Sequence, residues 1–76
     1  MNQTFTLVVN DQPDVLLRII GVLTRYNVCI KSFSHVPAEE EGTAIMTFSA
    51  FFEEKWYDLV LKQLVKLIDV IELKET

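Results

Sequence analysis

The feature that most limits the fold of this chain is a hydrophobic period that switches between roughly two and 3.6 residues along the sequence. Phe5, Leu7 and Val9 stand at every second position in a segment rich in β-branched residues, which predicts a strand from Thr4 to Val9. From Pro13 to Tyr26 the apolar residues follow helical spacing instead. The face predicted for this helix consists of Leu16, Ile19, Ile20 and Leu23.

The second half of the chain repeats the pattern. Strand character returns from Val28 to Val36, a charged turn follows from Pro37 to Gly42, and a further strand runs from Thr43 to Phe51. The two strands therefore predict a hairpin. A second helix is expected from Glu53 to Ile68 and a last strand from Val70 to Lys74. The apolar face predicted for this helix consists of Tyr57, Val60, Leu61, Leu64 and Ile68.

The order β-α-β-β-α-β is typical of the α+β ferredoxin-like sandwich, a four-stranded antiparallel sheet with two helices on one face. We expect one domain over residues 1–76, because a chain this short can build only one core. The helix-free face is expected to be partly apolar in either strand register, which favours an oligomer. In the first register that face carries Thr6, Val8, Cys29, Phe33, Ile45 and Thr47.

Composition excludes several classes of partner. Seven basic residues against eleven acidic ones, a net charge of -4, argue against binding a phosphate backbone. A single cysteine, Cys29, cannot form an internal disulfide, and we find neither a secretion leader nor an apolar run long enough to cross a membrane. These features predict a soluble, cytoplasmic protein.

The residues that most resemble a chemical site are Asp11 and Asp14, in the turn before the first helix. Helix capping is the favoured role: Asp11 can accept first-turn N–H groups, and Asp14 complements the helix dipole. His35 lacks a second ligand at metal spacing and is expected at the surface or an interface, whereas Cys29 is expected to be a structural thiol. No sequence motif therefore supports an enzymatic function. The best candidate for a binding site is the mouth of the turn, where the free N–H groups at the start of the helix suit a carboxylate.

Three segments resemble a known family. The opening "NDQPDVLLRIIGVL" matches a family pattern at Val15, Leu16, Arg18, Ile19, Gly21 and Val22, and "IMTF" matches its third strand. "QLVKLIDV" differs from the family's Gln-Leu-Asn-Lys-Leu-Ile-Asp-Val by one residue. From Thr4 to about Lys74 the chain is similar to the ACT domain, in particular that of the small, regulatory subunit of acetohydroxyacid synthase (AHAS), also called acetolactate synthase.

The resemblance implies a noncatalytic subunit, here of a short single-domain type, that binds and activates the catalytic large subunit in the biosynthesis of valine, leucine and isoleucine. No cofactor is expected in this chain, since thiamine diphosphate, Mg²⁺ and FAD would belong to the large subunit. The family also implies a homodimer that pairs through sheet edges. The alternative function is a freestanding ACT-domain sensor of another amino acid that regulates a different enzyme.

The resemblance further places an allosteric valine site on three positions, which correspond here to Asp11, Asp14 and Cys29. In valine-sensitive members these positions are Asn, Gly and Asn. Asp14 adds a negative charge where the ligand's carboxylate would approach, and Cys29 removes a side-chain amide. The substitutions predict weak sensitivity or insensitivity to valine.

Overall fold

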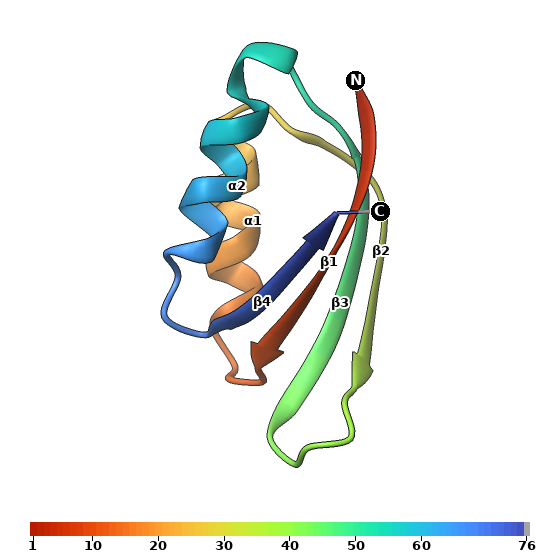
Figure 1. Cartoon of the computed structure of the whole chain (residues 1–76), viewed down its shortest axis with the longest axis vertical. Helices are drawn as coiled ribbons and strands as arrows, with labels where there is room; N and C mark the ends of the chain where they lie inside the picture. Colours follow the sequence, from red (N-terminus) through yellow and green to blue (C-terminus); the bar gives the residue numbers. More distant parts are fainter. Residues whose placement is uncertain (76) are drawn as a thin grey trace.

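The computed structural model describes residues 1–75 and has the predicted βαββαβ order. The elements are β1 (Asn2–Asn10), α1 (Val15–Arg25), β2 (Cys29–Pro37), β3 (Thr43–Phe51), the short 3-10 helix η1 (Glu54–Trp56), α2 (Tyr57–Val65) and β4 (Val70–Glu75). The strands form one sheet in the order β2-β3-β1-β4, and each neighbouring pair is antiparallel. Both helices cover the same face of this sheet (Figure 1), so the ferredoxin-like prediction is confirmed.

The core lies between the two helices and the inner strands β1 and β3. Alternate residues of these strands are buried, and the rings of Phe5 and Phe48 stack with their centroids 5.3 Å apart. The helices complete the core with Ile19 and Leu23 from α1 and Leu64 from α2. Burial of these large apolar side chains supplies the main driving force for folding. The remaining core residues are Leu7, Val9, Val15, Ala44, Met46, Ala50, Phe52 and Val60.

A bulge in β2 changes which side chains share a face. Ile30 pairs with Ala50 but Ser32 pairs with Ser49, so Lys31 is an extra residue with no partner on β3. Beyond the bulge the alternation is inverted, and Phe33 stands opposite Phe48 on the helix side, with their ring centroids 4.9 Å apart. The predicted placement of Phe33 on the helix-free face is therefore wrong, because one inserted residue moves every following side chain to the other face.

The second helix is shorter than its apolar spacing predicts. It begins with η1 at Glu54, and α2 ends at Val65 rather than at Ile68. Ile68 is 84% exposed, in a turn closed by the Val70 N–H, which donates to the Leu67 carbonyl. Assigning Ile68 to the buried face is therefore wrong. The turn is needed because the chain must reverse within a few residues to start β4 at Val70.

The helix-free face is more polar than expected. Cross-strand hydroxyl pairs join β1 to β3, with Thr4 Oγ1 lying 2.9 Å from Ser49 Oγ and Thr6 Oγ1 lying 3.4 Å from Thr47 Oγ1. Val8 and Ile45 occupy the next paired positions on the same face, as expected. None of the helices over residues 1–75 is long and apolar enough to cross a membrane.

Candidate functional site

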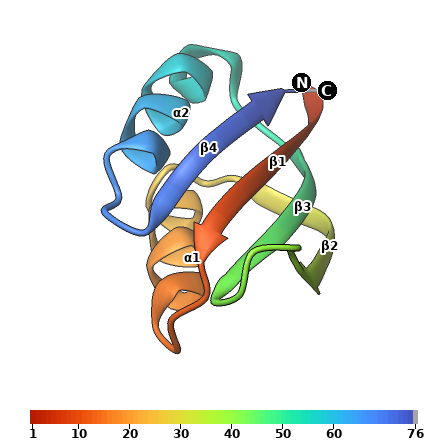
Figure 2. The same cartoon turned by 60° about the horizontal axis from the view of Figure 1, so that its bottom comes forward.

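The mouth of the first turn contains a pocket of about 350 Å³ at one end of the sheet. The loop that follows β1 is held there by backbone bonds: the Asn10 N–H donates to the Asp69 carbonyl and the Asp11 N–H to the Gly42 carbonyl, each at 2.8 Å. Gly42, at φ 83°, makes the left-handed turn that brings the β2–β3 hairpin to this loop. The two loops lie at the same end of the molecule in both views (Figures 1 and 2). The pocket is lined by Asp11, Gln12, Pro13, Val15, Leu16, Phe33, His35 and Met46.

The polar rim of this pocket is a contact between Asp11 and His35. His35 Nε2 lies 3.2 Å from Asp11 Oδ1, a hydrogen bond in which the imidazole N–H donates to the carboxylate. The two residues are 24 positions apart in the sequence, and both side chains are partly exposed. Asp11 therefore uses its carboxylate on β2 and not on the first turn of α1, so its predicted capping role is wrong. The expectation that His35 lies at the surface is confirmed.

Asp14 occupies the N-cap position of α1 but its side chain makes no capping hydrogen bond. The carboxylate instead forms an ion pair with Arg18 one turn later, with Oδ2 2.8 Å from the guanidinium Nη2. Both side chains are about half exposed, so the pair contributes little to folding stability. The predicted capping role of Asp14 is therefore wrong, although the residue does stand at the position where the helix starts. It lies beside the pocket lining and not in it.

The floor of the pocket is made by core side chains. Val15 and Met46 are each 1% exposed, and Leu16 is half-buried beside them. Phe33 forms a wall from the edge strand and rests on Phe48. A small apolar cavity with a few polar groups at its rim suits a small ligand that has an apolar body and one polar end. Over residues 1–75 we find no group of three or more side chains that could hold a metal ion.

Cys29 does not lie at this pocket. It pairs with Phe51 at the start of β2, whereas Asp11 bonds to Gly42 beyond the other end of β3. The thiol is exposed and does not belong to the core. A single chain therefore brings Asp11 and Asp14 to one end of the sheet and leaves Cys29 at the opposite end.

Sequence reasoning missed two residues of the pocket, His35 and Phe33. Their placement depends on the β2 bulge, which carries no signal in the hydrophobic pattern. Phe33 does not stand out in the sequence either, because β2 also contains the apolar residues Ile30 and Val36.

Comparison with known proteins shows which family the chain is similar to. The family model of the AHAS small subunit-like ACT domain matches residues 5–72. A probable acetolactate synthase small subunit from Methanothermobacter thermautotrophicus is 36% identical over 67 residues, which are 88% of this chain and 40% of the relative. A probable acetolactate synthase small subunit from Archaeoglobus fulgidus is 32% identical over 75 residues, or 99% of this chain and 47% of the relative.

The chain therefore spans just under half the length of these curated relatives. Among solved structures, the acetolactate synthase small subunit from Thermotoga maritima superposes with a TM-score of 0.85 at 19% sequence identity. The superposition covers 99% of this chain and 47% of that one, and it supports the fold.

Proposed function

Because the chain belongs to the family of AHAS small subunit-like ACT domains, we propose that it is a noncatalytic regulatory unit of an acetolactate synthase. It binds the catalytic large subunit in the cytoplasm, raises the activity of that subunit, and carries no cofactor of its own. The observation that carries this proposal is the match of the family model over residues 5–72, which includes the pocket loop and both helices. In this assignment thiamine diphosphate, Mg²⁺ and FAD belong to the large subunit.

We propose that valine inhibits the complex only weakly. Two acidic residues of the loop, Asp11 and Asp14, support this proposal. The carboxylate of Asp11 is already bonded to His35 through Oδ1, so an incoming ammonium group has to compete with the imidazole for it. Asp14 places a second carboxylate at the start of α1, where the carboxylate of an amino acid would approach the free N–H groups of the first turn. Arg18 offsets part of this repulsion, so we propose weak sensitivity in preference to complete insensitivity.

The proposed homodimer forms through the outer edge of β2. Every residue of Cys29–Pro37 is exposed, and β2 has a neighbour on only one side within residues 1–75. An antiparallel pairing of two such strands centred on Phe33 would set Cys29 of one copy opposite Pro37 of the other. That arrangement brings Cys29 to the end of the sheet where Asp11 and His35 lie, which supports a site completed by two copies.

Dimer formation is tested by sedimentation equilibrium of the wild type, Phe33→Lys and Phe51→Lys. Phe33 and Phe51 are 40% and 43% exposed, but only Phe33 lies on the edge strand. We expect Phe33→Lys to weaken the dimer by placing like charges opposite each other, and Phe51→Lys to leave it intact. A monomeric wild type, or equal loss in both variants, contradicts pairing through β2.

Function is tested by reconstituting the chain with the acetolactate synthase catalytic subunit of the same organism and measuring acetolactate formation during a valine titration. We expect activation and little inhibition. In a variant carrying Asp11→Asn, Asp14→Gly and Cys29→Asn, the valine concentration that gives half-inhibition is expected to fall by about tenfold or more. The matched control is Asp58→Asn, which removes an acid from the first turn of α2 instead.

Two results contradict the proposal. Strong inhibition of the wild type at low valine concentration refutes the weak response, and failure to bind or activate the catalytic subunit refutes the regulatory role. In the second case the pocket favours the alternative function, a freestanding amino-acid sensor, because its apolar floor can take a side chain other than that of valine. Calorimetry of the chain against a panel of amino acids identifies that ligand.

A further inference from the structure

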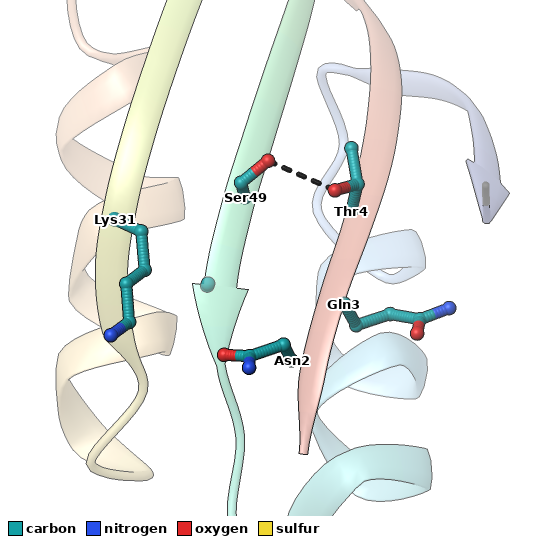
Figure 3. A pocket seen from close by; sticks show the side chains of 6 residues that line it. Asn2, Gln3, Thr4, Lys31 and Ser49 are labelled. Atoms are coloured by element: carbon teal, nitrogen blue, oxygen red, sulfur yellow. Dashed lines mark hydrogen bonds between the residues drawn. The ribbon is translucent and has the colours of Figure 1, made fainter.

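A second hollow, of about 450 Å³, lies on the helix-free face at the other end of the sheet from the Asp11 pocket. It spans the three strands β2, β3 and β1, and Figure 3 shows its side chains from this face. The residues lining it are Asn2, Gln3, Thr4, Lys31, Ser49 and Ala50.

Lys31 is the only charged residue of the lining. The lining contains no carboxylate to accompany the ammonium group. Such a lining is unusual in a chain that has eleven acidic residues and seven basic ones. The ion pairs found over residues 1–75 join Asp14 to Arg18, Asp11 to His35 and Glu72 to Lys74, so Lys31 takes part in none of them. A lysine without a counter-ion beside neutral hydrogen-bonding groups favours an anionic ligand.

The β2 bulge sets the position of this lysine. Lys31 is the inserted residue, between Ile30 opposite Ala50 and Ser32 opposite Ser49. Bulges often occur beside binding sites because they redirect a side chain. In Figure 3 the Lys31 side chain runs down β2 toward the level of the Asn2 amide on β1.

The hydroxyl groups supply neutral donors next to the charge. Thr4 Oγ1 and Ser49 Oγ are 2.9 Å apart, so one hydroxyl donates to the other and the second O–H remains free to donate outward. Gln3 extends away from Lys31 in Figure 3, and its amide bonds to Tyr57 on the other side of β1. The side-chain donors of the lining on this face are thus the Lys31 ammonium beside β2, the Asn2 amide and one hydroxyl of the Thr4–Ser49 pair.

We propose that this hollow binds the oxyanion group, carboxylate or phosphate, of a small metabolite between Lys31, Asn2 and the Thr4–Ser49 hydroxyl pair. The site goes beyond the proposed valine response, because it lies on the opposite face of the sheet and uses none of its three positions. Its volume falls within the usual range for small-molecule sites.

The experiment is an amide chemical-shift titration of the chain with inorganic phosphate and, separately, with sodium acetate at constant ionic strength. We expect saturable shifts with a dissociation constant of about 1 mM or weaker, centred on Lys31 and Ser49. Saturation by phosphate alone assigns a phosphate group to the ligand, and saturation by acetate assigns a carboxylate.

Three variants test the geometry. Lys31→Met is expected to weaken binding by about tenfold or more, and Ser49→Ala by about twofold to tenfold, because a charge-assisted hydrogen bond contributes more than a neutral one. The matched control is Lys62→Met, which removes an exposed lysine of the same charge from α2.

The proposal is overturned if neither anion gives saturable shifts, if Lys62→Met weakens binding as much as Lys31→Met, or if Ser49→Ala leaves the affinity unchanged. A valine experiment that fails while the phosphate or acetate titration succeeds rejects only the proposed function. A valine experiment that succeeds while both anion titrations fail rejects only the Lys31 site.

Discussion

The Asp11 pocket and the Lys31 hollow both use residues of β2 and β3 but offer opposite chemistry. Met46 of β3 closes the pocket on the helix side, whereas Ser49, three residues later, lines the hollow on the free face. The alternation of side chains along a strand accounts for the difference, since helices cover one face and leave the other to solvent. One sheet can therefore present an apolar site with an acid and a polar site with a base at opposite ends.

The two sites also differ in what supports them. The floor of the pocket belongs to the hydrophobic core, so a change that alters its shape also alters the stability of the fold. Apart from the buried Ala50, the hollow is lined by exposed or partly exposed side chains whose removal leaves no internal cavity. We expect ligand binding and folding stability to be coupled at the Asp11 pocket and nearly independent at the Lys31 hollow.

The largest effect is expected for Met46→Ala. Met46 is 1% exposed, and truncating a buried methionine costs about 2–5 kcal/mol of unfolding free energy through lost burial and a residual cavity. Urea denaturation measures this loss. Met46→Leu is the matched control and should cost less than about 1.5 kcal/mol because it nearly conserves volume. Equal stability of Met46→Ala and the wild type would show that the pocket floor is not part of the core.

A smaller effect is expected for the Asp11–His35 contact. Both side chains are partly exposed, so solvent and salt screen the interaction, and the coupling energy should be about 0.2–1 kcal/mol. A double-mutant cycle with Asp11→Ala, His35→Ala and the double variant measures it, using urea denaturation at neutral pH. A coupling near zero would mean that the loop is held only by its backbone bonds to Asp69 and Gly42.

Alkaline pH should affect the end of the molecule near the Lys31 hollow through Tyr57. Burial, together with the hydrogen bond to Glu75, raises the pKa of Tyr57 from 10.0 to about 12. Since the folded pKa is the higher one, the contact stabilises the fold fully below pH 10 and is lost as the pH rises toward 12. The loss should be small, because the contact is exposed.

Comparing the unfolding free energy of the wild type and Tyr57→Phe on either side of pH 10 measures this contribution. The wild type should lose more stability than Tyr57→Phe over that interval. Parallel pH profiles for the two proteins would show that the Tyr57–Glu75 contact adds nothing to stability.

The fold can be predicted from the sequence because it depends on the spacing of apolar residues within each strand and helix. Phe5, Leu7 and Val9 face the core in the register that their spacing predicts, and Ile19 and Leu23 lie on the predicted face of α1. The ends of elements are less readable. Ile68 continues the helical spacing, but the return of the chain to the sheet takes precedence and ends α2 at Val65.

The candidate sites can be predicted from the sequence only in part. The loop carrying Asp11 and Asp14 is recognisable from its residues, but the partner of Asp11 is His35, 24 residues away on another strand. That contact, the wall made by Phe33 and the hollow beside Lys31 all depend on one inserted residue in β2. A bulge shifts the pairing register between two strands without requiring any particular residue type, so the sequence pattern gives no sign of it.

The smallest effect is expected for Lys31→Met on stability, in contrast to its proposed effect on anion binding. Lys31 is exposed and takes part in none of the ion pairs over residues 1–75, so its replacement should change the unfolding free energy by less than about 0.5 kcal/mol. Urea denaturation measures this, with Lys62→Met as the control. A loss above about 1 kcal/mol would mean that Lys31 serves the fold, and the separation between a structural pocket and a free hollow would not hold.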